Sequence, residues 1–79
     1  MSALPQRRHR LQVLDACLVL LEDALERGQA RVDAPLGSRL RNLLGLAGLI
    51  PDHRLEGRRV DRVLDDIFEL QEEATGRAS

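Results

Sequence analysis

The chain has 79 residues, a net charge of −1 and 43% hydrophobic residues, with Phe68 as its only aromatic side chain. This length fits one domain that buries only about 60–65% of its unfolded surface, so its core is marginal. Cys17 is the single cysteine, which excludes an internal disulfide, and two distant histidines add too few ligands for a structural zinc. Oligomerisation, and a homodimer in particular, is therefore expected to complete the core.

The first segment, about residues 5–27, is predicted to be the longest helix. Its leucines recur at alternating steps of three and four, which is a sustained helical stripe. Gly28 follows as a helix stop. The residues expected on its apolar side are Leu11, Val13, Leu14, Cys17, Leu18, Leu20, Leu21, Ala24 and Leu25.

The second helix is predicted over residues 34–50. Asp33 is a suitable N-cap with Pro35 in the first turn, Ser38 is the alternative cap, and Pro51 ends the helix. The residues expected to face the core are Leu36, Leu40, Leu43, Leu44, Ala47 and Ile50.

The third helix is predicted over residues 58–75, with Gly76 as its stop and residues 76–79 as a frayed tail. The residues expected to face inward are Val60, Val63, Leu64, Ile67, Phe68 and Leu70. A leucine-rich, aromatic-poor composition also favours helices over strands. The sequence therefore predicts an all-α fold, a compact three-helix domain.

Membrane attachment and secretion are not expected. The longest run without a charged or polar side chain or a proline, residues 43–50, has eight residues, whereas a transmembrane helix needs about 20. No signal peptide is visible at the N-terminus, because Asp15, Glu22 and Asp23 interrupt the apolar residues that follow the first arginines. With one unpaired cysteine, a cytoplasmic location is predicted.

Catalysis, a metal site and a cofactor site are not expected either. Cys17 lies on an apolar helix side without the positive neighbour that a reactive thiolate needs. His9 and His53 have no partner that the sequence identifies, and the chain has no lysine, tyrosine or tryptophan. We therefore predict that the protein is not an enzyme.

The charges in the first and third helices are distributed against the helix dipole, which favours acids at the start and bases at the end. Arg7, Arg8 and Arg10 lead the first helix, and acids end it. Such an order suits an antiparallel neighbour, either inside the chain or across a two-fold axis. The charged contact surface predicted from it comprises Arg7, Arg8, Arg10, Arg58, Arg59, Arg62, Asp65, Asp66 and Glu69.

Two glycines interrupt the apolar end of the second helix. Gly45 and Gly48 fall where polar side chains would continue, and each costs about 0.5–1 kcal/mol relative to alanine inside a helix. We predict that another helix backbone approaches there, with Leu46 and Leu49 beside the contact. Slack in the helix, a frayed end before Pro51 and close packing inside the domain are the alternatives.

These features favour a small helical protein–protein interaction module, either a homo-oligomer or a minor, regulatory subunit of a larger complex. The alternative is a nucleic-acid-binding regulator. In that case the second and third helices would form a helix-turn-helix, with Arg58, Arg59 and Arg62 leading the recognition helix and the N-terminal arginines as a basic arm. The connector at residues 51–57 is long for such a turn, and the net charge of −1 disfavours this reading.

Overall fold

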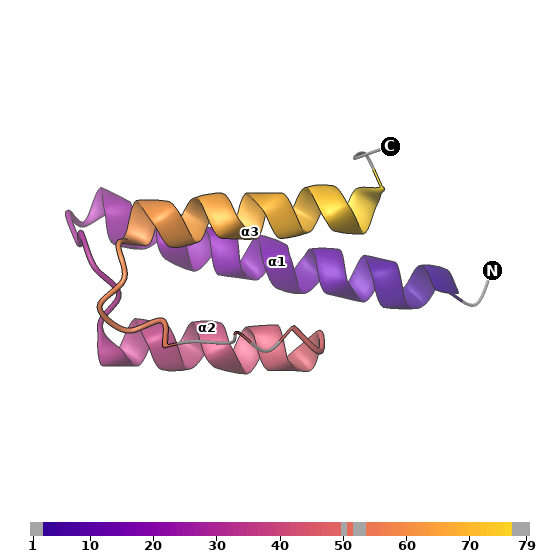
Figure 1. The fold of residues 1–79 in the computed structure, drawn as a ribbon, viewed down its shortest axis with the longest axis horizontal. Coiled ribbons are helices and arrows are strands. Elements are labelled where there is room, and N and C mark those ends of the chain that lie inside the picture. Colours follow the sequence, from indigo (N-terminus) through magenta and orange to yellow (C-terminus); the bar gives the residue numbers. More distant parts are fainter. Residues whose placement is uncertain (1–2, 50, 52–53, 77–79) are drawn as a thin grey trace.

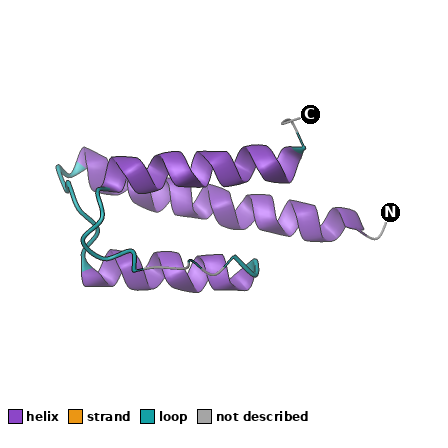
Figure 2. Cartoon of the chain, in the orientation of Figure 1, coloured by secondary structure: helices purple, strands orange, loops and turns teal. Residues whose placement is uncertain are grey.

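Three helices form the computed structural model, which describes residues 3–49, 51 and 54–76, with the side chains of residues 3–7 left out. The helices are α1 (Ala3–Glu26), α2 (Ala34–Leu46) and α3 (Val60–Thr75). Both α2 and α3 pack against α1 and run opposite to it, and the connectors meet at one end of the molecule (Figure 1, Figure 2). The predicted all-α, three-helix fold with a long first helix is confirmed.

Helix α1 supplies the centre of the core. Its buried residues repeat with helical spacing and form a face wide enough to contact both α2 and α3. They are Val13, Leu14, Cys17, Leu18, Leu21 and Ala24. Leu25, expected on the same side, is 40% exposed because it lies in the last turn before α1 ends at Glu26. The apolar stripe is therefore covered along most of the helix and open at its C-terminal end.

Helix α2 begins as the sequence predicts and ends four residues earlier. The Asp33 side chain accepts a hydrogen bond from the Leu36 amide at 2.9 Å, which caps the first turn. At the other end Gly48 has a φ of +72°, and the Leu49 amide reaches back to the Leu44 carbonyl at 2.8 Å. This is a Schellman stop, so the predicted extension to Ile50, itself outside the described residues, is wrong.

Helix α3 begins at Val60, two residues later than predicted, because the preceding residues pair with the first connector. The Val32 amide donates to the Arg58 carbonyl, and the Val60 amide donates to the Ala30 carbonyl, both at 2.8 Å. Arg31 and Arg59 form an isolated antiparallel bridge. Gly76 ends α3 in the left-handed conformation at φ 75°, as its position in the sequence predicts.

The connectors also supply core residues that the helical pattern did not reveal. Val32 and Leu55 are both buried and join the core cluster. Conversely, Phe68 was expected inside and is 44% exposed. Ile67 takes the buried position, and one further residue turns the side chain by about 100° around the helix axis, away from the core.

Candidate functional site

The predicted glycine interface lies at the C-terminal end of α2. A side chain added at Gly45 or Gly48 would meet nothing within 4 Å, so the alternative of close packing inside the domain is wrong. The left-handed φ of Gly48 accounts for that glycine as a helix stop, and the segment is not an uninterrupted helix. Leu46 is 66% exposed, whereas Leu49 is half-buried against the core.

This end of α2 is also tied to α1. The His9 ring nitrogen Nε2 lies 3.2 Å from the Leu46 carbonyl oxygen, within hydrogen-bond distance. The bond uses one of the carbonyls that every helix leaves unsatisfied at its C-terminus. Leu46, Gly45 and Gly48 therefore belong to a helix terminus anchored inside the chain.

The predicted charged surface is divided between the two ends of the molecule. Arg8 and Arg10 lie near the start of α1, while Arg58, Arg59 and Arg62 lie at the start of α3, at the opposite end (Figure 1). The molecule is 41 Å long, so the two arginine groups do not form one surface. The side chain of Arg7 lies outside the described part of the chain.

The antiparallel arrangement of α1 and α3 does not produce the ion pairs that the charge order predicted. Ion pairs at the start of α3 join Arg59 to Asp61 at 2.8 Å and Arg58 to Asp66 at 3.7 Å. Within residues 8–49, 51 and 54–76, no ion pair is found that joins α1 to α3. Asp65 and Glu69 lie on the exposed side of α3.

Helices α2 and α3 do not form a helix-turn-helix. Both pack on α1 and run in the same direction, and the described part of the connector, residues 47–49, 51 and 54–59, is much longer than a tight turn (Figure 1). A helix-turn-helix instead joins two helices at about 90–120° through a turn of three or four residues. The arginines at residues 58 and 59 therefore belong to the connector, and only Arg62 lies inside α3.

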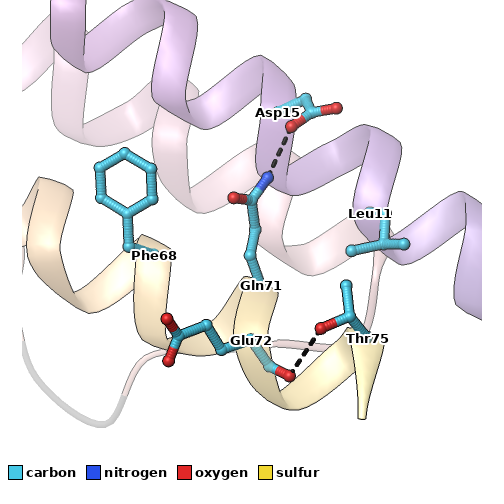
Figure 3. Close-up of a pocket in the computed structure, with 6 residues that line it drawn as sticks. All are labelled: Leu11, Asp15, Phe68, Gln71, Glu72 and Thr75. Carbon is cyan, nitrogen blue, oxygen red and sulfur yellow. Dashed lines mark hydrogen bonds between the residues drawn. The ribbon is translucent and has the colours of Figure 1, made fainter. Parts of the chain in front are cut away.

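The outer side of α1 and α3, away from α2, carries a shallow groove that the sequence analysis did not identify. We call it the α1–α3 groove; its volume is about 390 Å³, and it is lined by Leu11, Asp15, Phe68, Gln71, Glu72 and Thr75 (Figure 3). Gln71 Nε2 donates to Asp15 Oδ1 at 2.5 Å across the two helices. The Thr75 hydroxyl donates to the Glu72 carbonyl at 2.9 Å, so it satisfies the helix end.

Apolar side chains lie along this groove. The Asp15–Gln71 hydrogen bond sets the antiparallel register, which places Val19, four residues after Asp15, level with Ile67 and Phe68. Val19 is 63% exposed and Phe68 is 44% exposed, while Leu11 and Leu64 are half-buried. These four residues, Leu11, Val19, Leu64 and Phe68, form a partly exposed apolar strip, of which Leu11 and Phe68 line the groove.

Exposed acidic side chains lie on the same sides of α1 and α3 as the groove, and two of them, Asp15 and Glu72, line it. We call them the acidic rim, and they are Asp15, Glu22, Glu26, Asp65 and Glu72. None of the five has an ion-pair partner in the described part of the chain. By contrast, Asp23, Glu56, Asp61 and Asp66 each have an arginine partner.

Two further features bear on possible chemistry, a smaller cavity and the single cysteine. A smaller cavity of about 140 Å³ between α2 and α3 is lined by core residues such as Leu40 and Val63, with Asp66 at its edge. Burial raises the pKa of the Cys17 thiol to about 11, so the thiol is protonated at neutral pH. Among the described residues, no group of three or more histidine, cysteine or acidic side chains is placed to hold a metal ion.

Comparisons with protein-family models, with curated proteins and with solved structures find no match for this chain. Within its described residues, none of the helices has the length and apolar character to cross a membrane. The residues of the α1–α3 groove therefore have to be interpreted from their own chemistry. One pattern in the sequence points to this side of the molecule. Arg8, Asp15 and Glu22 are spaced seven residues apart, which places these three charges on one side of α1.

Proposed function

We propose that this chain is a small helical protein–protein interaction module, which works as a homo-oligomer or as a minor, regulatory subunit of a larger complex. On this proposal the protein acts by binding and not by catalysis. The single observation that carries it is the position of Phe68. In a chain with a marginal core, the only aromatic side chain is 44% exposed and lines the α1–α3 groove.

Aromatic residues dominate the energetics of protein cores and interfaces, because each buries about 150–250 Å². A small chain gains most by placing its only aromatic residue in the core. Here leucine, valine and isoleucine fill the core, and Phe68 stands beside it. A partner surface that covers Phe68 and Val19 would recover this burial, which is the basis of interface hot spots.

Nucleic-acid binding has less support from the same observations. Arg8 and Arg10 are separated from the arginines of α3 by most of the length of the molecule. The exposed groove between α1 and α3 is acidic, and a phosphate backbone would be repelled from it. The proposal therefore favours a protein partner.

The native mass of the full chain tests the proposed function. We expect the tagged chain in an extract of its own cells to migrate in size-exclusion chromatography above the mass of one chain. Purified protein examined by light scattering over a range of concentrations then separates self-association from a second component. A chain that is folded by circular dichroism and monomeric under both conditions would contradict the proposal.

A further inference from the structure

We infer that the α1–α3 groove binds an amphipathic helix of a partner protein, a helix that is apolar on one face and carries lysine or arginine on both flanks. This inference rests on the proposed function and specifies the chemistry of its partner. It combines three observations, namely the shape of the groove, its apolar strip and the unpaired charges of the acidic rim.

The groove has the form that helix recognition requires. It follows two packed antiparallel helices, and its apolar lining has Leu11 at one end and Phe68 at the other (Figure 3). A third helix laid against two others buries side chains at positions i, i+3, i+4 and i+7. Between Phe68 and Thr75 the groove covers about 10 Å at 1.5 Å per residue, which corresponds to roughly two turns of such a helix.

The charges indicate the flanks of the bound helix. By helical spacing, Glu22 and Glu26 lie on the same side of α1 as the lining residue Asp15, and Asp65 lies on the same side of α3 as the lining residue Glu72. Four acids without an ion-pair partner among the described residues repel one another and attract cations. Lysine or arginine on both flanks of the bound helix would neutralise these acids at the edge of a water-excluding contact.

Arg8 gives the bound helix a direction. This arginine lies on the same side of α1 as Asp15, at the opposite end of the groove from Glu26, and has no ion-pair partner in the described residues. The C-terminus of a helix carries a partial negative charge and its N-terminus a partial positive charge. The bound helix is therefore best placed antiparallel to α1, with its C-terminus near Arg8.

A second copy of this chain fits the groove less well. Asp65 and Glu72 lie three and four residues on either side of Phe68. A two-fold axis that packs Phe68 on Phe68 would bring Asp65 of one copy near Glu72 of the other. These like charges repel, whereas a stable isologous contact needs opposite charges to face each other. The apolar centre suits a dimer, but the acids of α3 do not.

Peptide binding to the full chain tests the inference. The first probe is a fluorescently labelled peptide of about 18 residues, with leucine along one helical face and lysine or arginine on both flanks. The second has the same composition in an order without an apolar face, and the third has glutamate in place of the basic residues. We expect the first peptide to bind at least about tenfold more tightly than the other two, and more weakly at high salt.

Variants of the chain locate the contact. Val19→Asp is expected to weaken binding of the first peptide at least about tenfold, whereas Leu46→Asp, at a residue of similar exposure on α2, changes it less than about twofold. Glu22→Arg combined with Glu72→Arg is expected to weaken binding by a similar factor. Glu73→Arg is its control, because this exposed residue lies on the same helix but does not line the groove. Circular dichroism confirms that each variant is folded.

Several results would overturn the inference. Equal binding of the first two peptides would show charge attraction without a groove, and an unchanged affinity of Val19→Asp would place the contact elsewhere. Self-association that Val19→Asp abolishes would assign the groove to a second copy. In that case the proposed function survives and the inference of a basic partner helix fails. The same holds if Leu46→Asp, and not Val19→Asp, disrupts the native complexes. A chain that is monomeric in the extract and binds no peptide contradicts both.

Discussion

The α1–α3 groove and the C-terminal end of α2 each expose an apolar side chain to nearly the same extent, 63% for Val19 and 66% for Leu46. The side of α1 and α3 that carries the groove also has an exposed aromatic ring and five acids without an ion-pair partner in the described residues. Around Leu46 lie a helix stop at Gly48 and the Leu46 carbonyl, which accepts a hydrogen bond from His9. Equal exposure therefore has different meanings at the two places.

The difference shows why a single exposed leucine does not identify an interface. More than half of a folded surface is apolar, so exposure alone is ordinary. At the end of α2 the local geometry already explains the residues, because a left-handed glycine and the amide that follows it terminate the helix. In the groove, no contact within the described chain explains why Phe68 and the acidic rim lie together.

The largest expected effect separates the two sides of α3. Ile67→Ala removes a side chain that is 2% exposed and should lower the free energy of unfolding by about 2–5 kcal/mol. Phe68→Ala removes a half-exposed side chain, so its cost should be smaller, about 1 kcal/mol. Urea denaturation followed by circular dichroism measures both values.

Peptide binding is the control for these two variants. Phe68→Ala is expected to remain folded but no longer to bind the basic peptide. If Phe68→Ala destabilises the chain as much as Ile67→Ala, the ring belongs to the core and the comparison between groove and core fails. If it leaves peptide affinity unchanged, the ring has no role in recognition.

The same contrast on α1 predicts a dependence of stability on pH. Cys17 is fully buried, two residues before the exposed Val19, and burial raises the pKa of its thiol from 9.0 to about 11. Because the unfolded thiol ionises first, its contribution to stability is complete below about pH 9 and is lost as the pH rises toward 11. The loss should reach about 2–3 kcal/mol, at roughly 1.4 kcal/mol per pKa unit.

The composition makes this measurement unusually selective. The chain has no lysine or tyrosine, and arginine keeps its charge, so Cys17 is the only side chain that titrates in this window. Cys17→Ala is the matched control and should show no such loss between pH 9 and 11. A loss of the same size in Cys17→Ala would mean that another process destabilises the protein at alkaline pH.

Gly45, in the last turn of α2, and Gly48, just after the helix, provide the next largest effect, with opposite signs at the two positions. Gly48→Ala forces a side chain into a φ of +72° and should cost about 1–2 kcal/mol. Gly45→Ala fills open space in a regular part of α2 and should stabilise the chain by about 0.5–1 kcal/mol. Thermal unfolding of the two variants gives the comparison directly.

The hypothesis that another helix backbone approaches α2 still applies at Gly45, because no atom of the described chain lies within 4 Å of a side chain added there. Gly45→Leu tests that hypothesis without the strain of Gly48. Loss of oligomerisation or of partner binding in Gly45→Leu, with stability unchanged, would move the interface from the α1–α3 groove to the end of α2.

The helices could be predicted because their signals are local. Asp33 accepts a hydrogen bond three residues ahead and Gly76 ends α3, so both positions are encoded within a few residues. The end of α2 was misplaced because Pro51 is a strong stop signal, while Gly48 acts earlier through a backbone conformation that glycine also adopts elsewhere. Only the hydrogen bonds to the Leu44 and Gly45 carbonyls distinguish the two.

The groove could not be predicted from residue type because it depends on which helices become neighbours. Phe68 has the hydrophobicity of a core residue, and only the register of α3 against α1 makes Ile67 the buried one. Val32 and Leu55 show the reverse, since connector residues become buried when the two connectors pair. The reversed charges predicted a contact surface, but the structure separates arginines that the sequence treats as one group.

The smallest expected effect tests whether the charge of the groove matters apart from its structure. Asp15 accepts a hydrogen bond from Gln71 Nε2 and belongs to the acidic rim. Asp15→Asn retains an acceptor oxygen but removes the charge, so the free energy of unfolding should change by less than about 0.5 kcal/mol, as for an exposed polar substitution. The affinity for the basic peptide should fall about two- to fourfold, with a weaker dependence on salt. Asp15→Ala removes both functions and is the comparison. If the two variants bind the peptide equally, charge governs recognition at this position; if only Asp15→Ala weakens binding, the bond to Gln71 does, because it holds the two walls of the groove together.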